Sequence, residues 1–248
     1  MQYHFNGFQP GDPDVHPALP KPRTPADALP DTVDVLIAGS GPAGLCLAAQ
    51  LAGVPHISTM VIEPKLAPME KGQADGISVR SMEMFQAFGF AEQVMREAMW
   101  INETTFWAPV ADAGAAAPAP APTPTTCTPA TTLQRVARVQ DVPEGISEMP
   151  HVLINQARVH DFFLDIMRNA PSRLTPDYGW KVLDLQVDPG TDQHPVTVTL
   201  ARTAPGCENQ THTVRANYVI GCDGARSTVR RAIGGALHGD AAHQAWGV

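Results

Sequence analysis

The sequence predicts an α/β domain with a three-layer, Rossmann-like core, and three observations predict it. An apolar run of strand length, VDVLIAG from Val33, leads directly into PAGLCLAAQLA, a helix pattern of small and apolar residues. A second apolar strand, TMVIE, begins at Thr59. A third, YVIG, begins at Tyr218 and precedes a turn and a short basic helix. Strands that are covered on both faces read as continuous apolar runs, which is the pattern of a parallel sheet between helices.

Composition disfavours two classes of partner. The chain has 248 residues, of which 44% are hydrophobic, so it can form one large domain or two small ones around a packed core. Its formal net charge of −8 argues against a nucleic-acid surface, where a basic face is expected. Its 9 histidines follow no zinc-ligand spacing, so we expect no metal site.

The cysteines and the N-terminus indicate the compartment. Cys46, Cys127, Cys207 and Cys222 are far apart and form no CxxC pair, which fits a reducing environment better than a disulfide framework. The N-terminus MQYHFNGFQPGDPD has neither the basic nor the apolar region of a signal peptide. The most apolar stretch contains a glycine turn, which explains it better than a membrane span does. We therefore expect a cytoplasmic protein with no membrane partner.

The rest of the chain divides by composition. Residues 1–32 are rich in proline and polar residues and are predicted to form a surface arm, followed by one domain over residues 33–248. Within that domain, residues 111–132 consist largely of Pro, Ala and Thr and are predicted to be a disordered insertion. RSMEMFQAFGF and QARVHDFFLDIMRNA are predicted helices, the first ending near Gly89. WKVLDLQV, PVTVTLA and NYVIGCDG are predicted strands.

A GxGxxG motif between the first strand and the first helix carries the main chemical signal. Its residues are Gly39, Ser40, Gly41, Pro42, Ala43 and Gly44. In this context the first glycine allows a tight turn, the second lets a pyrophosphate approach the backbone, and the third lets helix and strand pack closely. Glu63 ends the second strand, where an acid binds ribose hydroxyls and repels a 2′-phosphate. The motif predicts FAD or NAD rather than NADP; the alternative is an ordinary glycine-rich turn.

The late strand with its Asp223-Gly224 turn favours FAD over NAD. An NAD dehydrogenase would continue with further parallel strand–helix units, whereas this chain returns with YVIGCDGARSTVRRAIG. Beside the first glycine turn, Asp223 and the following N–H groups would reach the same dinucleotide. The alternative is a plain turn before a basic surface helix. Arg226, Arg230 and Arg231 are then either a solvated face or a group that attracts an anionic nicotinamide cofactor or substrate.

This order of motifs resembles the flavoprotein aromatic hydroxylases, the group A monooxygenases, whose FAD domain is of the glutathione-reductase type. GQADGISVRSMEMFQAFGF and LINQARVHDFF are similar to the phenol hydroxylase branch. The resemblance implies that Gly72, Gln73, Ala74 and Gln156 lie against the flavin and that Arg80 faces the cofactor phosphates. It also implies that Asp75 is the catalytic carboxylate that interacts with the substrate hydroxyl. The alternatives are that Arg80 is a helix-surface charge and Gln156 a helix cap.

The same resemblance implies an activity. The complete enzyme would use FAD, reduced by NADPH, and O2 to hydroxylate a phenolic aromatic acid, with Asp75 helping to deprotonate the phenol. Three further segments restrict the resemblance to a smaller group of enzymes within the branch: MQYHFNGFQPG, PMEKGQADGI and HGDAAHQAWGV. The chain looks incomplete relative to the family. The resemblance also leaves a homodimer open as the assembly of the full-length enzyme. Two alternatives stay open: another FAD-dependent oxidoreductase on this fold, such as a dehydrogenase or halogenase, or an inactive flavin-binding fragment. The exact acid and the choice between NADH and NADPH also stay open.

Overall fold

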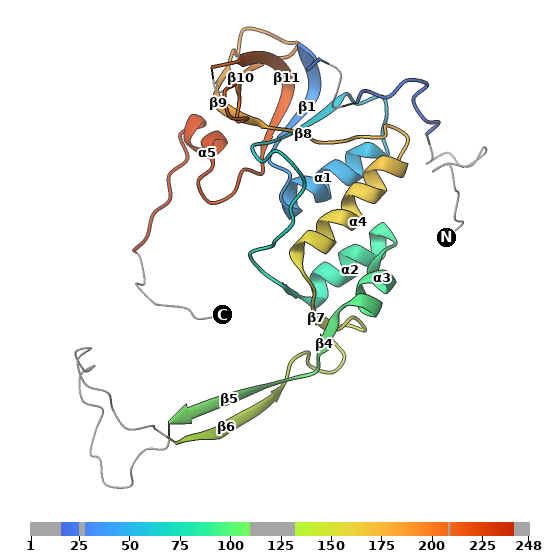
Figure 1. Cartoon of the computed structure of the whole chain (residues 1–248), viewed down its shortest axis with the longest axis vertical. Coiled ribbons are helices and arrows are strands. Elements are labelled where there is room, and N and C mark those ends of the chain that lie inside the picture. Colours follow the sequence, from blue (N-terminus) through green and yellow to red (C-terminus); the bar gives the residue numbers. More distant parts are fainter. Residues whose placement is uncertain (1–15, 25–27, 110–131, 208, 241–248) are drawn as a thin grey trace. The chain divides into compact units, whose positions relative to one another are not determined.

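The structure is a computed structural model that describes residues 16–24, 28–109, 132–207 and 209–240 (Figure 1). The chain divides into two compact units, which are described separately. Unit 1 comprises Met1–Gln73 and Gln156–Val248, and unit 2 comprises Ala74–Asn155. Apart from Thr132, the predicted insertion at 111–132 lies outside the described residues.

Unit 1 contains a six-stranded sheet in the order β8-β2-β1-β11-β10-β9. Its strands are β1 (Thr32–Ala38), β2 (Thr59–Glu63), β8 (Asp177–Tyr178), β9 (Trp180–Val187), β10 (Val196–Arg202) and β11 (Thr211–Gly221). The strands β8, β2, β1 and β11 are parallel to one another, and β10 and β9 extend the sheet as antiparallel strands. This sheet confirms the predicted Rossmann-like fold class.

The central position of β1 explains its apolar sequence from Val35 to Ala38. It lies between β2 and β11, and Leu36 and Ile37 are both fully buried. Adjacent residues of a strand point to opposite faces, so burial of both requires cover on both faces. Leu36 belongs to a core cluster that also contains Val198 of β10 and Val229 of α5 (Thr228–Ala232).

Two helices of unit 1, α1 (Pro42–Ala52) and α4 (Gln156–Asn169), pack against each other (Figure 1). The buried face of α1 is made largely of small residues, among them Gly44, Ala48 and Ala52, which permit a close approach. The buried face of α4 is bulkier. It consists of Val159, His160, Phe162, Phe163, Leu164 and Met167. The helix is confirmed where the sequence predicts it, and these residues share one face of it.

The described part of the predicted N-terminal arm contacts the rest of unit 1. The N–H of Leu19 donates to the carbonyl of Pro171 at 2.9 Å, and the carbonyl of Asp31 accepts from the N–H of Arg215 at 2.8 Å. Arg23 forms an ion pair with the buried carboxylate of Asp177. Burial raises the pKa of Asp177 despite this guanidinium partner, because desolvation of the carboxylate is the larger effect.

Unit 2 is a small α+β arrangement. Its elements are β3 (Gly76–Ile77), α2 (Val79–Phe88), α3 (Ala91–Glu97), β4 (Met99–Ile101), β5 (Glu103–Pro109), β6 (Leu133–Gln140) and β7 (His151–Leu153). Gly89 ends α2 with a φ of +85°, which confirms the predicted helix stop. The ring centroids of Phe85 and Phe90 lie 4.6 Å apart, and Met82 and Val94 of the same unit are fully buried.

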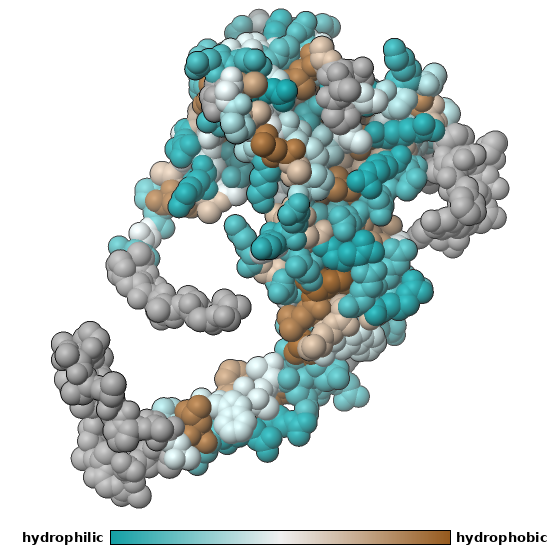
Figure 2. Space-filling view, viewed as in Figure 1, coloured by the Kyte–Doolittle hydropathy of each residue, from teal (hydrophilic) through white to brown (hydrophobic). Residues whose placement is uncertain are grey.

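Strands β5 and β6 of unit 2 form a two-stranded antiparallel ribbon that carries exposed apolar side chains. Figure 2 shows brown side chains along this ribbon. Its exposed apolar residues are Phe106, Trp107, Leu133, Val136 and Val139. Arg138 and Glu103 form an ion pair across the two strands. Because an isolated ribbon is marginally stable in water, its order depends on such cross-strand pairs.

None of the described helices is long and apolar enough to cross a membrane.

The packing of the glycine turn predicts a sharp contrast between two Gly→Ala variants. A Cβ on Gly44 would lie 1.9 Å from the carbonyl oxygen of Gly39, whereas a Cβ on Gly41 would meet nothing within 4 Å. We expect Gly44→Ala to lower the free energy of unfolding by about 3 kcal/mol, because backbone must move. Gly41→Ala should lower the free energy of unfolding by less than about 1 kcal/mol, because it only replaces the N-cap residue of a helix. Chemical denaturation of both variants measures this, and equal midpoints would contradict the packing.

Candidate functional site

The turn between β1 and α1 can be made only with glycine at its first position. Gly39 has a φ of +102°, and a Cβ there would lie 2.4 Å from the carbonyl oxygen of Cys222. Its N–H donates to the carbonyl of Ile62 at 2.8 Å, which ties the turn to β2. The turn is therefore held between the ends of β2 and β11 by backbone contacts.

The next part of the turn presents an open helix N-terminus. Gly41 is the N-cap of α1 and has open space where a side chain would stand. Pro42 and Ala43 begin the helix, no side chain caps it, and its first turn has no acidic residue. Free N–H groups and the positive end of the helix dipole favour an anion at this point. The space above Gly41 fits a phosphate group.

Glu63 lies beside this turn and is fixed by it. Its Oε2 accepts hydrogen bonds from the N–H and the hydroxyl of Ser40, both at 2.9 Å. Its Oε1 accepts from the N–H of Lys65 at 3.0 Å. Each carboxylate oxygen can accept a further hydrogen bond, so Glu63 can bind vicinal hydroxyls in a fixed orientation.

The second predicted turn lies beside the first, as the strand register requires. Ala38 of β1 pairs with Gly221 of β11, and the N–H of Cys222 donates to the carbonyl of Ala38 at 2.8 Å. The chain then turns through Gly224, which has a φ of +77°. The two turns leave adjacent strand ends of one parallel sheet, which is where such folds bind ligands.

Asp223 is occupied within the protein. Its Oδ1 accepts from the hydroxyl of Ser227 at 2.5 Å, and its Oδ2 accepts from the N–H of Thr228 at 2.6 Å and of Val229 at 3.2 Å. The carboxylate therefore caps the N-terminus of α5. Asp223 is still one of the residues that line the cavity described below.

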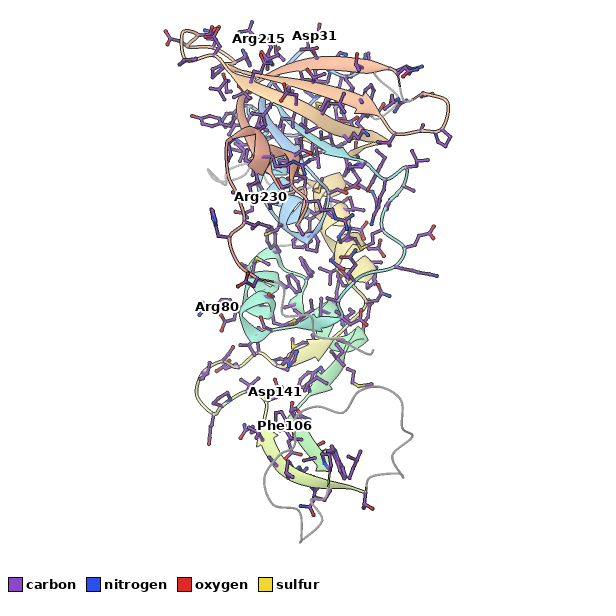
Figure 3. The ribbon with its side chains drawn as sticks, turned by 90° about the vertical axis from the view of Figure 1, so that its left-hand side faces the viewer. Asp31, Arg80, Phe106, Asp141, Arg215 and Arg230 are labelled. Carbon is purple, nitrogen blue, oxygen red and sulfur yellow. The ribbon has the colours of Figure 1, made fainter. Side chains whose placement is uncertain are left out.

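The basic residues after this turn make local contacts. The guanidinium of Arg230, labelled in Figure 3, donates to the carbonyl of Ala225 at 2.9 Å. The guanidinium of Arg231 donates to the hydroxyl of Thr228 at 3.0 Å. Arg226 precedes α5, is exposed, and lines a second cavity of about 200 Å³.

Gln156 joins two segments that are distant in the sequence. Its Oε1 accepts the N–H of Gln73 at 2.8 Å, and a Cβ on Gly72 would lie 2.3 Å from the Cβ of Gln156. The start of α4 therefore fixes the Gly72–Gln73 segment. Gln156 acts on the loop through its side chain and is not merely a helix cap.

These segments enclose one cavity in unit 1, with a volume of about 280 Å³. Its lining comprises Gly39, Ser40, Gly41, Glu63, Pro64, Lys65, Ala67, Met69, Gln73, His160, Cys222, Asp223 and Gly224. The structure thus brings together the glycine turn, the acid at the end of β2, Gln73 and the second turn. Among the residues that the structure describes, no group of acids, histidines and cysteines could hold a metal ion.

Sequence reasoning missed six residues of this lining, which are Pro64, Lys65, Ala67, Met69, His160 and Cys222. The most informative of them is His160. It is only 3% exposed, and burial lowers the pKa of its imidazole. It lies four residues after Gln156, so both side chains stand on one face of α4. A histidine within an otherwise apolar helical stripe was the signal that could have found it.

The remaining predicted site residues belong to unit 2. Asp75 and Ala74 are exposed, and the carbonyl of Asp75 accepts the N–H of Ile154 at 2.9 Å. Arg80, labelled in Figure 3, has a side chain that is 91% exposed and pairs with Glu83 at 3.6 Å. Within its own unit, Arg80 is a charged group on the surface of α2.

A parallel sheet with a glycine turn, an open helix N-terminus and an acid at the end of the second strand defines a dinucleotide-binding domain. The profile of the FAD binding domain family matches residues 32–248, and the chain belongs to this family. FAD is therefore the cofactor of this domain, as the sequence predicts.

Similar proteins agree with this assignment. The chain is 54% identical to 3-hydroxybenzoate 4-monooxygenase of Comamonas testosteroni over 100% of its own length and 36% of that enzyme. It is 35% identical to the FAD-dependent monooxygenase terD of Aspergillus terreus over 87% of the chain and 32% of the relative. The resemblance to the aromatic hydroxylases is thereby confirmed. The chain spans about a third of the length of these relatives, 36% and 32%.

Two solved structures share the fold. The flavin-dependent monooxygenase PieE, in complex with FAD and substrate, has a TM-score of 0.64 at 24% identity over 86% of this chain and 34% of its own. The p-nitrophenol 4-monooxygenase PnpA from Pseudomonas putida DLL-E4 has a TM-score of 0.63 at 20% identity over 83% of this chain and 44% of its own. At these identities the likeness shows the fold.

The open space at Gly41 predicts a variant that folds but does not bind FAD. A valine side chain would fill the position of a phosphate without meeting any protein atom near its Cβ. We expect Gly41→Val to lower FAD affinity by about a hundredfold or more, equivalent to about 2.7 kcal/mol. The purified variant should be colourless and should unfold near the wild-type midpoint. A yellow variant with full flavin content would contradict the assignment of the turn.

The contacts of Glu63 predict a double effect for Glu63→Ala. Loss of hydrogen bonds to ribose should weaken FAD binding about tenfold or more, because charged partners contribute about 1.5–3 kcal/mol. The variant also leaves the N–H of Ser40 without its acceptor, which should cost about 1–3 kcal/mol of stability. Flavin titration and denaturation measure the two effects. Ser40→Ala, which removes only the hydroxyl contact, is the matched control and should affect both less.

Proposed function

We propose that this chain forms the FAD-binding part of an enzyme that hydroxylates a phenolic aromatic acid with NADPH and O2. The observation that carries the proposal is 54% identity to 3-hydroxybenzoate 4-monooxygenase along the whole chain, which includes the GQADG segment. The cavity in unit 1 supports it, because its lining suits a dinucleotide. We also propose the cytoplasm as its compartment, since Cys207 and Cys222 form no disulfide.

The residues of unit 1 would each take a part of FAD. Gly39, Ser40, Gly41, Pro42, Ala43 and Gly44 would hold the pyrophosphate through backbone N–H groups and the α1 N-terminus. Glu63 would bind the adenosine ribose and repel the 2′-phosphate of NADP, so that NADPH is a co-substrate rather than the resident cofactor. The second turn, Asp223-Gly224, would border the same chain of sugar and phosphate.

The Gly72–Gln73 segment would form the flavin side of the site. Gln156 holds this segment through the N–H of Gln73, which leaves the loop fixed before ligand arrives. Ala74 continues the same segment along the chain. We also propose that Arg80 faces the cofactor phosphates, since its pair with Glu83 is exposed and therefore weak.

Asp75 is the residue that we propose acts on the substrate. It follows Gln73 by two residues, and two residues of chain span at most about 7 Å. Its carboxylate is exposed, so a ligand can reach it. A carboxylate that accepts the proton of the phenol makes the ring more electron-rich and easier to hydroxylate. When bound and reduced, FAD supplies the chemistry that activates O2.

The proposal predicts that Asp75→Asn separates NADPH oxidation from hydroxylation. The variant keeps the size of the side chain but removes the base, so FAD should still bind. Hydroxylation should fall by about 10²–10⁴-fold, the usual loss for a general base. The ratio of hydroxylated product to NADPH consumed, with 3-hydroxybenzoate as substrate, should fall with it.

The matched control is Glu92→Gln, which removes an exposed carboxylate from α3 of the same unit. It should leave the ratio and the rate unchanged. If Asp75→Asn also keeps the wild-type ratio and rate, Asp75 is not the base. If it loses FAD instead, Asp75 is a cofactor or structural residue.

A further inference from the structure

His160 places a buried polar atom in the cavity without a protein partner. The residue is 3% exposed, and among the described residues no group hydrogen-bonds its Nε2. Buried side-chain nitrogens are hydrogen-bonded in the large majority of cases, so an orphaned one calls for an explanation. A ligand that binds in the cavity would supply the missing partner.

The position of His160 selects the kind of ligand group. It lines the same cavity as Gly41, where a phosphate fits, and Glu63, whose carboxylate suits sugar hydroxyls. Phosphate oxygens and sugar hydroxyls both pair with an imidazole nitrogen. Both occur along the sugar–diphosphate chain of a dinucleotide.

The charges around His160 favour a neutral ring while the cavity is without its ligand. Burial is the main cause that lowers the pKa of His160, and the Lys65 ammonium lowers it further. Glu63 and Asp161 raise it, but by less. Asp223 of the second turn lines the same cavity. Helix α1 brings no charged side chain, because its sequence is PAGLCLAAQLA. A neutral imidazole can donate or accept at Nε2, depending on the tautomer.

We propose that His160 is a binding residue of this site, whose Nε2 forms a hydrogen bond with an oxygen of the sugar–diphosphate chain of FAD. The inference rests on the proposed assignment of the cavity to FAD. In this proposal His160 binds the ligand, and its unpartnered Nε2 lowers the stability of the protein without ligand. A histidine that merely fills the core would show the opposite behaviour, because an apolar substitute would leave ligand binding unchanged.

Two substitutions in the full chain separate these cases. His160→Leu replaces an unpartnered polar group with an apolar one, so the ligand-free protein should unfold at the wild-type midpoint or above it. Its affinity for FAD, measured by flavin fluorescence, should fall about tenfold. His160→Gln carries an amide that reaches about as far as Nε2 and should recover most of the affinity. His56→Gln, at an exposed histidine outside the cavity lining, is the matched control and should bind FAD normally.

Proton uptake on FAD binding, measured by calorimetry in two buffers, shows whether the partner of His160 is a phosphate oxygen or a sugar hydroxyl. A phosphate partner favours the imidazolium and raises the pKa of His160 in the complex. Affinity would then be highest below the lowered pKa that His160 has without FAD, and it would fall as pH rises from there through the raised pKa, a slope absent from His160→Leu. A hydroxyl partner gives the same loss of affinity in His160→Leu without proton uptake. Both results support the proposal.

Other results overturn it in distinguishable ways. If the wild-type protein binds FAD and His160→Leu binds it equally well, His160 is a core residue and only this inference fails. If His160→Leu loses stability together with affinity, and His160→Gln does not recover the affinity, the role of His160 is structural. If the wild-type protein itself does not bind FAD, the assignment of the cavity fails, and this inference fails with it.

Discussion

The close contact of backbone with backbone at the ends of β1, β2 and β11 is the constraint on which the site depends. Gly44 lies so close to Gly39 that a Cβ would stand 1.9 Å from the carbonyl oxygen, and a Cβ on Gly39 would stand 2.4 Å from the carbonyl oxygen of Cys222. Neither glycine has room for a side chain, so the start of α1 lies directly against the sheet. Its N–H groups then point into the space left open at Gly41. The glycines thus have two physical roles: Gly39 and Gly44 permit packing, and Gly41 leaves room for a ligand.

The two acids at this edge of the sheet have different partners, which gives them different roles. Glu63 accepts hydrogen bonds from Ser40 and Lys65 and keeps an edge toward the cavity. Asp223 directs both oxygens at the start of α5, where the helix dipole and N–H groups hold a negative charge. The first acid is therefore prepared for a ligand with hydroxyl groups. The second mainly fixes the turn that ends β11, so its contribution to a ligand is through the backbone that it positions.

Helix α4 connects the cavity to the segment that leads to Asp75. Gln156 and His160 stand one turn apart. The first fixes Gln73, and the Nε2 of the second, which lines the cavity, has no hydrogen-bond partner among the described residues. One helix therefore sets both the loop and part of the cavity wall before ligand binds. Such preparation costs stability in the ligand-free protein, since a buried nitrogen without a partner is unfavourable. That cost is repaid only when a ligand supplies the missing hydrogen bond.

Local pattern was enough to predict the parallel sheet, the glycine turn, the acid at the end of β2 and the stop of α2 at Gly89. These features depend on neighbouring residues, because periodicity, glycine conformations and strand ends are properties of short segments. It could not reveal that Asp223 caps α5, that Gln156 holds Gln73, or that His160 lines the cavity. Those facts depend on which side chains meet across 83 residues of chain or on which buried atom lacks a partner. Packing alone decides them, because the same residues would serve equally well as surface or core groups in another arrangement of the same elements.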